Sequence, residues 1–214
     1  TTNSSLLSYI LIQAGFDPSY FTGGVSLSHK SGTIADSKWS VVEGDEYQVS
    51  ISDKRPKFVY YNPSHLLLTA VSWDHADLYP TEESYFSVFK DLISKTKFIV
   101  ANKDNDKIRE LVNKAVWYGS KDADYVYSDV VQTRDGLDFK INGIDIHSQL
   151  IGKFQAENIT GCFAMASELG IDQGIIIEAI ANFKGMKRRL EKRHVGDITV
   201  YDDTHCFQLS HCVT

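Results

Sequence analysis

The spacing of apolar and polar positions along the first half of the chain predicts helices that alternate with strands. Apolar residues spaced three and four apart indicate amphipathic helices, whereas short apolar runs that stop at turn residues indicate strands. The predicted helices cover residues 1–15, 80–96 and 104–114, and the predicted strands cover residues 39–42, 58–61, 66–71 and 97–101. Their alternation favours an α/β fold with a mostly parallel sheet flanked by helices.

The pattern changes after residue 115. Short β runs continue to residue 146, and they are interrupted by Asp135-Gly136 and Asn142-Gly143, which are strong hairpin-turn signals. We therefore predict a small antiparallel β appendage on the α/β body.

The last part of the chain returns to helical spacing and then to a strand. Helices are predicted over residues 149–169 and 172–183, and a strand over residues 198–201. A basic stretch that begins at Lys184 connects them. We predict a domain boundary there, which separates residues 1–184 from residues 185–214.

Composition narrows the class of protein. A chain of 214 residues with 43% hydrophobic residues can bury a sizeable core. The formal net charge is −6, and basic residues gather only between Lys184 and Arg193, so we expect no nucleic-acid partner. No apolar stretch approaches the length of a membrane span, so we expect no membrane partner either. The sequence gives no indication of an oligomeric state.

The cysteines point to a reducing compartment. Cys162, Cys206 and Cys212 are an odd number and lack any paired metal-binding or redox spacing. Because this argues against a disulfide framework, we expect free thiols and a cytoplasmic location. The chain also begins inside a predicted helix and without a methionine or a signal peptide, so we expect that preceding sequence is missing.

Polar side chains follow the strand predicted at residues 66–71. Asp74, His75 and Asp77 come shortly after it. Ligands of open α/β sheets lie beyond the carboxyl ends of the strands, so this is a candidate catalytic edge. The alternative is structural: Asp74 caps the next helix, and His75 is an ordinary loop histidine.

A second strand also ends in acids. The run Trp39–Val42 leads directly into Glu43, and Asp45 and Glu46 follow. Carboxylates at such a strand end can hold Mg²⁺ beside a nucleotide phosphate, because Mg²⁺ prefers oxygen ligands. A solvated acidic turn is the alternative.

Further motifs complete a set that suits phosphoryl transfer, in which positioned charges stabilise the transferring phosphoryl group. In chain order the set is the Thr1 helix start with Gly23-Gly24, Val42-Glu43-Gly44-Asp45-Glu46-Tyr47, Asp74-His75-Ala76-Asp77, Gly152 to Asn158 with Gln155, Arg188-Arg189-Leu190-Glu191 and Tyr201-Asp202-Asp203. This order resembles the Mur ligases, the ATP-dependent amide-forming enzymes of peptidoglycan synthesis.

The resemblance implies a fold, cofactors and roles. Residues 1–184 would be a P-loop NTPase-like central ATP-binding domain, and residues 185–214 the start of a C-terminal domain. ATP and Mg²⁺ would be bound. The implied Mg²⁺ ligands are Thr1, Glu43 and His75. The implied nucleotide-binding residues are Thr1, Asn158, Arg189 and Asp203, of which Asn158 would bind the adenine, Arg189 the phosphates and Asp203 the ribose. The implied catalytic residues are Glu43, His75 and Arg189.

Within the family, residues 53–61 and 74–79 are most similar to the members that join UDP-N-acetylmuramate to the tripeptide L-alanyl-γ-D-glutamyl-meso-diaminopimelate in peptidoglycan recycling. The implied reaction passes through an acyl phosphate of the muramyl carboxylate, which the peptide amine attacks. Members that add L-alanine are the alternative. A non-catalytic nucleotide-binding remnant and a purely structural interaction module are further alternatives, and the last predicts that Glu43 and His75 point away from each other.

The sequence also departs from the family pattern. The Gly-rich phosphate loop and its lysine would precede Thr1, and so would the domain that holds the UDP sugar. Ala70 stands where the family has Asn, and Phe154-Gln155 where it has His-Asn. Residues 204–208 do not follow the family's Phe-Ala-His-His-Pro, and we expect that residues 204–214 are not native sequence. We therefore expect the chain to be an inactive fragment.

Overall fold

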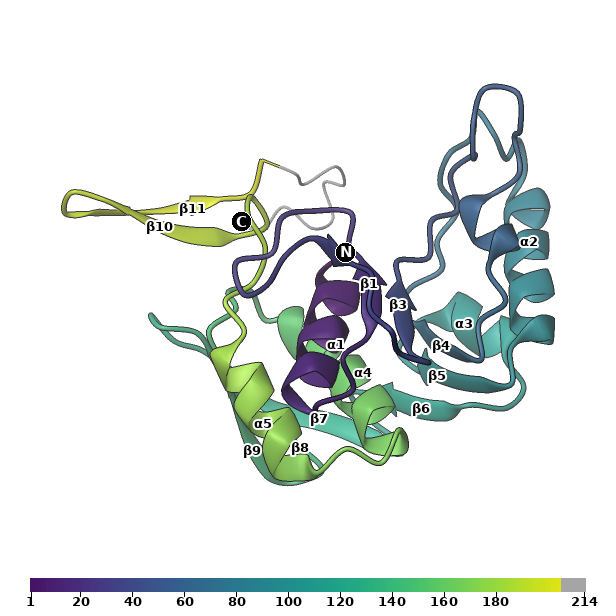
Figure 1. The fold of residues 1–214 in the computed structure, drawn as a ribbon. Coiled ribbons are helices and arrows are strands. Elements are labelled where there is room, and N and C mark those ends of the chain that lie inside the picture. The colour runs from purple at the N-terminus through teal and green to yellow at the C-terminus, as the bar shows by residue number, and fades with distance from the viewer. Residues whose placement is uncertain (205–214) are drawn as a thin grey trace. The chain divides into compact units, whose positions relative to one another are not determined.

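The computed structural model describes residues 1–204, which form two compact units (Figure 1). The first unit combines Thr1–Glu43 with Val126 and the residues that follow it, and the second is Gly44–Tyr125. The domain boundary predicted near Lys184 is a different division and stays a prediction. Cys206, Cys212 and the departure from the family pattern at residues 205–208 lie outside the described residues.

Three helices form the core of the first unit. They are α1 (Thr2–Gln13), α4 (Gln155–Glu168) and α5 (Gln173–Asn182), and α1 packs against both of the others. Close packing is possible because α4 carries small residues such as Ala156, Gly161 and Ala164, whose positions are completely or almost completely buried. The predicted helices over residues 1–15 and 172–183 are confirmed.

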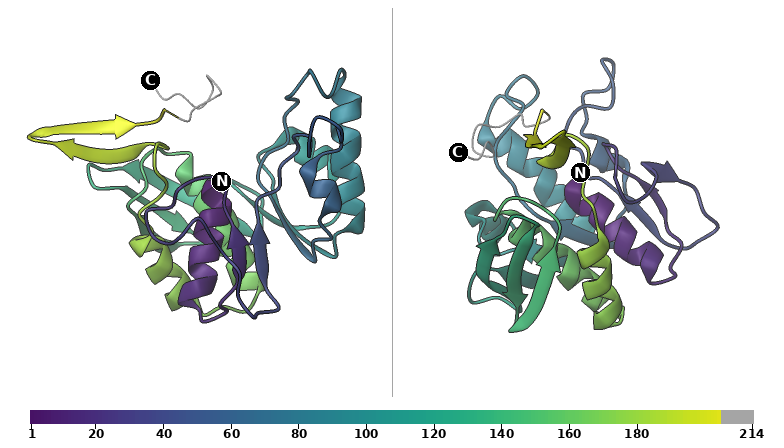
Figure 2. Two further views of the ribbon diagram at one scale, coloured as in Figure 1. Left: turned by 45° about the horizontal axis from the view of Figure 1, so that its top comes forward. Right: turned by 90° about the vertical axis from the view of Figure 1, so that its left-hand side faces the viewer.

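An antiparallel sheet supports these helices. It consists of β7 (Tyr125–Gln132), β8 (Leu137–Ile141) and β9 (Ile144–Ser148), and α4 and α5 cover it (Figure 2). Alternate residues of β8 are buried, as the period of a strand with one covered face requires. Asn142 and Gly143 both have positive φ, which suits a two-residue hairpin turn. The predicted antiparallel appendage is confirmed.

Helix α4 begins later than predicted. The expected start was residue 149, but the helix begins at Gln155. Gly152 has φ +101°, a backbone conformation that is incompatible with a right-handed helix. The segment before α4 is therefore a loop, and its Gly152 amide donates to the side chain of Gln132 (2.6 Å).

A small sheet carries the acidic strand end. Its order is β2-β1-β3, with β1 (Ser19–Phe21) antiparallel to β2 (Gly32–Thr33) and parallel to β3 (Ser40–Val42). Strand β3 also contacts α1, which brings its carboxyl end towards the start of that helix. The strand predicted at residues 39–42 is confirmed.

The described chain ends in a hairpin of β10 (Glu191–Val195) and β11 (Ile198–Asp202). The strand predicted at residues 198–201 is confirmed. Its partner β10 was not predicted, because Glu-Lys-Arg-His gives no apolar signal. Backbone pairing with β11 forms it instead, and a diagonal ion pair joins Arg193 to Asp202 (3.3 Å).

Parallel strands form the sheet of the second unit. Their order is β4 (His65–Leu68), β5 (Phe98–Asn102) and β6 (Val116–Gly119). Helix α2 (Glu82–Lys95) connects β4 to β5, and α3 (Asp106–Leu111) connects β5 to β6. The predicted fold class, a mostly parallel sheet flanked by helices, is confirmed. We had assigned the run after residue 115 to the antiparallel region, and for β6 this was wrong.

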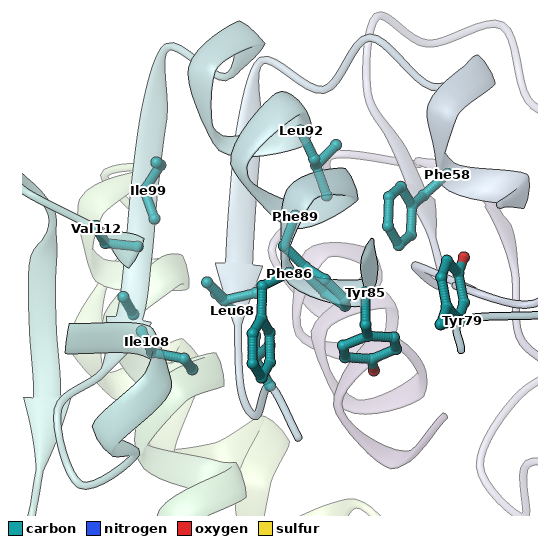
Figure 3. Close-up of a cluster of buried hydrophobic side chains, with 12 residues drawn as sticks. Phe58, Leu68, Tyr79, Tyr85, Phe86, Phe89, Leu92, Ile99, Ile108 and Val112 are labelled. Carbon is teal, nitrogen blue, oxygen red and sulfur yellow. The ribbon is translucent and has the colours of Figure 1, made fainter. Parts of the chain in front are cut away.

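Aromatic side chains dominate the core of this unit (Figure 3). The buried face of α2 supplies Tyr85, Phe86, Phe89 and Leu92, as its periodicity predicted. The ring centroids of Phe89 lie 5.0 Å from Tyr85 and 5.2 Å from Phe58. Such pairs add stability beyond the apolar area that they bury.

Several local predictions in this unit were wrong or gave different bounds. Residues 58–61 do not form a strand: Lys57–Tyr60 is a short 3₁₀ helix, because Pro56 starts a turn in which Val59 donates to the Pro56 carbonyl (3.1 Å). Pro80 does not lie in the first turn of α2, since Thr81 is the N-cap and forms a capping box with Ser84. Strand β4 also ends at Leu68, before the predicted residue 71, and α3 is shorter than predicted.

Among the described residues, no helix combines the length and apolarity needed to cross a membrane.

Candidate functional site

In the first unit, the start of α1 and the end of β3 bring two oxygen-bearing side chains together. The Thr1 hydroxyl donates to Glu43 Oε1 at 2.6 Å, although the residues are 42 positions apart. The backbone amide of Gly23 donates to the other carboxylate oxygen, Glu43 Oε2, at 2.9 Å. Both oxygens of Glu43 are therefore held in fixed positions.

The Gly23-Gly24 turn makes this approach possible. A Cβ atom at Gly23 would lie 2.7 Å from Glu43 Oε2, and one at Gly24 would lie 3.2 Å from Thr1 Cγ2. The first distance is shorter than real contacts allow. The turn therefore forms a close cradle around Glu43 that a side chain at Gly23 would fill.

The environment keeps Glu43 charged. Burial raises its pKa, but the Thr1 ammonium group, the Thr1 hydroxyl and the Gly23 amide together outweigh burial and hold the pKa below its ordinary value. The ammonium nitrogen lies 2.9 Å from Glu43 Oε1. Glu43 is thus a carboxylate at neutral pH.

A cation completes this group. Nη2 of Arg189 donates to the Thr1 hydroxyl oxygen at 3.2 Å, across 188 positions of sequence. Thr1 also occupies the N-cap position of α1, whose N-terminus carries a partial positive charge. We call Thr1, Gly23, Glu43 and Arg189 the Thr1–Glu43 cluster.

The donor atoms of the cluster fit Mg²⁺. Magnesium takes oxygen ligands near 2.1 Å in octahedral geometry, so two neighbouring ligand oxygens lie about 3 Å apart. Thr1 Oγ1 and Glu43 Oε1, 2.6 Å apart, are close to that separation. Within residues 1–204, no three His, Cys, Asp or Glu side chains form a group that could hold a metal ion. Magnesium, which often keeps waters and binds phosphate, suits a pair of protein ligands.

A cavity of about 590 Å³ lies in the same unit. Gln155 and Arg189 belong to its wall, and so do charged residues of the β10 strand and the segment before it. Gln155 also accepts a hydrogen bond from the Asn158 side chain (3.1 Å). The lining residues are Leu27, Asp135, His147, Gln149, Leu150, Ile151, Gln155, Ala181, Lys184, Gly185, Met186, Arg189, Leu190, Glu191, Lys192 and His194.

Asp203 fixes the segment that carries Arg189. One of its carboxylate oxygens accepts a hydrogen bond from the Leu190 amide at 3.2 Å. Arg188 and Leu190 both have positive φ, which is unusual for residues with side chains. The contact from Asp203 therefore holds a tight bend whose middle residue is Arg189.

In the second unit, His75 heads a turn after β4. Its carbonyl oxygen accepts from the amides of Leu78 and Tyr79 (2.8 and 2.9 Å), and its own amide donates to Asp74 Oδ1 (2.7 Å). His75 has φ +55°. The structural alternative, in which Asp74 caps the next helix, is wrong, because Thr81 is the N-cap of α2. The Asp74 carboxylate instead accepts from the His75 amide in this turn.

The imidazole of His75 faces residues from the acidic stretch. Nε2 lies 3.4 Å from Glu46 Oε1, and the ring meets Tyr47 edge-on, with 4.9 Å between ring centroids. The Tyr47 hydroxyl in turn donates to Asp77 (3.3 Å). We call residues 74–79 with Glu46 and Tyr47 the His75 turn.

Buried phenols anchor the same stretch. The Tyr79 hydroxyl donates to the Glu46 carbonyl at 2.6 Å. Burial, followed by the charges of Glu46 and Asp45, raises the pKa of Tyr79 to about 12. Burial also raises the pKa of Tyr85. Tyr79 is therefore a permanent hydrogen-bond donor at neutral pH and fixes the backbone next to His75.

A comparison of the sequence with known families gives a family assignment. Residues 25–166 match the family described as the Mur ligase middle domain. The chain belongs to the Mur ligase family. The predicted resemblance is confirmed.

Individual Mur ligases are similar over most of this chain. A UDP-N-acetylmuramate–L-alanyl-γ-D-glutamyl-meso-2,6-diaminoheptandioate ligase of Haemophilus influenzae is 27% identical, over 95% of this chain and 48% of its own length. A UDP-N-acetylmuramate–L-alanine ligase of Lactobacillus delbrueckii subsp. bulgaricus is 30% identical, over 95% of this chain and 46% of its own length. The chain thus spans about half the length of these curated relatives.

Solved Mur ligases share the fold. The UDP-N-acetylmuramate-alanine ligase of Thermotoga maritima has a TM-score of 0.81 and 23% identity, covering 95% of this chain and 47% of its own. A MurF ligase of Thermotoga maritima in complex with ADP has a TM-score of 0.68 and 18% identity, covering 95% of this chain and 50% of its own. At these identities the likeness shows the fold alone.

The structure brings some of the predicted Mur ligase site residues together. Thr1, Glu43 and Arg189 lie in one hydrogen-bonded cluster of the first unit. Asn158 and Asp203 belong to that unit, and His75 belongs to the second. The predicted roles of all of these residues, including a metal ion shared by Glu43 and His75, stay predictions.

Sequence reasoning missed several residues of the site. The Gly23 amide was seen only as part of a turn, although its spacing from Thr1 fitted the family. Gln155 was named in the helix-start motif and also as a departure from His-Asn, but its place in the cavity wall was not predicted. Glu46 and Tyr47 were part of the acidic motif, but their contacts with His75 across 28 or 29 positions leave no local signal in the sequence.

Proposed function

We propose that the protein to which this chain belongs is an ATP-dependent ligase of peptidoglycan synthesis that joins an amine to the carboxylate of UDP-N-acetylmuramate. Membership of the Mur ligase family supports this proposal. So do the names of the similar relatives, which are UDP-N-acetylmuramate ligases. The predicted cytoplasmic location accords with an enzyme that uses ATP, and it stays a prediction.

The observation that carries the proposal is the Thr1–Glu43 cluster. Carboxylate and hydroxyl oxygens lie in contact at a helix N-terminus, next to a guanidinium group. Oxygen ligands suit Mg²⁺, and a helix N-terminus and an arginine both attract phosphate oxygens. This combination favours a Mg²⁺–nucleotide site over a solvated acidic turn.

Each predicted residue then has a role in that site. Thr1 Oγ1 and Glu43 would hold Mg²⁺, with His75 as the proposed third protein ligand. Arg189 would bind the phosphates, Asn158 the adenine and Asp203 the ribose. Bound Mg²⁺ would supply positive charge beside the transferring phosphoryl group. Glu43 and Arg189 then act on the reaction by position and charge, which is the main requirement of phosphoryl transfer.

We propose the tripeptide L-alanyl-γ-D-glutamyl-meso-diaminopimelate as the amine substrate. Residues 53–61 support this choice by their similarity to tripeptide ligases, and in the structure they form a turn that leads into the 3₁₀ helix Lys57–Tyr60. Asp53 accepts hydrogen bonds from Arg55 and from Tyr60, and the Arg55 guanidinium lies 4.8 Å from the Tyr60 ring centroid. L-alanine is the second candidate, because L-alanine ligases are equally similar in sequence.

The proposed reaction has two chemical steps. The muramyl carboxylate attacks the γ-phosphorus of ATP, which forms an acyl phosphate and releases ADP. The neutral amine of the acceptor then attacks the acyl carbon, and inorganic phosphate leaves as the amide bond forms. We propose that residues 1–214 alone do not catalyse these steps, since they contain no Gly-rich phosphate loop.

A competition assay tests the proposal. The full-length parent protein receives UDP-N-acetylmuramate, ATP and Mg²⁺ with equal concentrations of L-alanine and the tripeptide, and the products are separated by mass. We expect ADP release that depends on UDP-N-acetylmuramate, and tripeptide product in excess. Excess L-alanine product would favour the second candidate, and ATP binding without either product would favour the non-catalytic alternative.

A further inference from the structure

A second cavity, in the second unit, lies at the opposite end of the strands from the His75 turn. It has a volume of about 540 Å³. Its walls are the last turns of α2 and α3 and the segments that enter β5 and β6, whereas the His75 turn follows the carboxyl end of β4. We call it the lysine-rimmed cavity, and its polar members include Lys90, Lys97 and Lys114.

The interior of this cavity is apolar. Ile99 and Val112 are buried and also belong to the core of the unit (Figure 3). Ile93, Phe98 and Leu111 line the cavity too, and none of them is among the strongly exposed apolar side chains of the described residues. The apolar surface is therefore recessed, as in a small-molecule pocket, and does not form a flat patch that would suit a protein partner.

The charge around the cavity has one sign. Among the described residues that line it, none carries a carboxylate. Nearby acids are engaged with lysines outside the lining: Asp91 with Lys95 (2.5 Å) and Glu110 with Lys107 (2.8 Å). Across residues 1–204, the ammonium groups of Lys90, Lys97 and Lys114 have no ion pair or hydrogen bond. This is unexpected in a chain with net charge −6.

Stabilisation of helix ends accounts for only part of this positive charge. Both α2 and α3 end at the cavity, and a helix C-terminus carries roughly half a negative charge. Two such ends offset about one of the three ammonium charges. The rim therefore keeps a positive excess that faces an apolar interior.

We propose that the lysine-rimmed cavity binds a small amphipathic anion, with an apolar body inside the cavity and a carboxylate or phosphate at the lysines. The volume lies within the range of roughly 300–1,000 Å³ that is typical of small-molecule sites. This site is independent of the nucleotide site and of the proposed ligase activity.

Calorimetric titration of the 214-residue chain with octanoate tests the proposal, with octanol as the uncharged probe of the same length. We expect saturable binding of octanoate and at least tenfold weaker binding of octanol. The variant K90Q/K97Q/K114Q should bind octanoate at least tenfold more weakly. The matched control K54Q/K121Q/K187Q loses the same charge at lysines outside the lining and should bind like the unmodified chain.

A second variant, which fills part of the cavity with a larger side chain, tests whether octanoate binds inside the cavity. Ala115→Phe places a ring at the cavity wall without changing charge and should also abolish octanoate binding, while an unchanged circular dichroism spectrum shows that the chain is folded. Absence of octanoate binding to the unmodified chain would overturn the proposal. Equal binding of octanol, equal weakening in the control variant, or full binding by a folded Ala115→Phe variant would overturn it as well.

Discussion

The Thr1–Glu43 cluster and the His75 turn are both polar sites next to strand ends, but they are built in different ways. The cluster joins residues that are far apart in sequence, and α1, β3 and the Gly23-Gly24 turn fix its geometry. The His75 turn combines hydrogen bonds to the His75 carbonyl with contacts to Glu46 and Tyr47. The ion pair between His75 and Glu46 is long, at 3.4 Å. Thr1 and Glu43 thus connect α1 to β3 by a short hydrogen bond, whereas the His75 imidazole is joined to Glu46 by a long ion pair.

This difference separates function from stability. A change in the cluster should affect both, because the site residues also connect structural elements. Loss of the His75 imidazole should affect function more than stability, because this side chain is not part of the aromatic core, whereas Tyr79 of the same turn is. The following variants test that distinction.

Removal of the Glu43 charge should have the largest effect. We expect Glu43→Gln in the full-length parent to lower kcat/KM on the order of 100-fold or more, as loss of a charge-stabilising group does in other enzymes. Steady-state ADP release measures it. Glu83→Gln, an exposed carboxylate in the first turn of α2, is the control and should leave kcat/KM unchanged. A similar loss in both variants would contradict a special role for Glu43.

A side chain at Gly23 should disturb the cluster through sterics. We expect Gly23→Ala to destabilise the chain by about 1 kcal/mol, because the new Cβ would displace the Glu43 carboxylate and weaken its hydrogen bonds to Thr1 and to the residue 23 amide. Urea unfolding measures it. Gly44→Ala adds the same methyl group where no heavy atom lies within 4 Å, and it should change stability by less than about 0.5 kcal/mol. Equal effects would show that the cradle is not tight.

Replacement of His75 should lower activity with little change in stability. His75 has φ +55°, so His75→Gly removes the imidazole from a backbone conformation that glycine readily adopts. We expect a change in unfolding free energy within about 1 kcal/mol, but at least a tenfold loss of ligase activity in the parent. Asp122→Gly, at φ +51° in the same unit, is the control and should keep activity. Full activity of His75→Gly would remove His75 from the site.

The smallest effect concerns pH. The pKa of Glu43 is lower in the folded chain than its ordinary value of 4.5, so its stabilising contribution is present above that value and is lost as pH falls through the lowered folded pKa. As pH falls from 5 to the pH at which the chain unfolds, the free energy of unfolding should decrease less for Glu43→Gln than for the unmodified chain. Urea unfolding across this range measures it, and parallel curves would contradict the lowered pKa.

The sequence predicted those features whose cause is local. The apolar spacing of α2 and the Asn142-Gly143 turn specify their own conformations, and both predictions were right. The strand end at Glu43 was also visible, because the apolar run before it is short and clear. Motif order then supplied the family, which agrees with the match over residues 25–166.

Features with a distant cause were missed. Residues 58–61 were predicted as a strand, but Lys57–Tyr60 form a 3₁₀ helix. The amides of Lys57 and Phe58 donate to the carbonyls of Tyr47 and Asp45, and the Val59 amide donates to the Pro56 carbonyl. The highly charged β10 is a strand only because β11 pairs with it. The first unit is interrupted by the whole second unit, and no local pattern marks its ends at Glu43 and Val126.

The most direct test of the Thr1–Glu43 cluster is the position of a bound metal ion. Crystals of the full-length parent grown with Mn²⁺ and a non-hydrolysable ATP analogue would reveal it by anomalous scattering. We predict an ion at about 2.1–2.2 Å from Thr1 Oγ1 and from a Glu43 oxygen, with Arg189 at the phosphates. A nucleotide-bound ion that contacts neither Thr1 nor Glu43, with their hydrogen bond intact, would contradict the account.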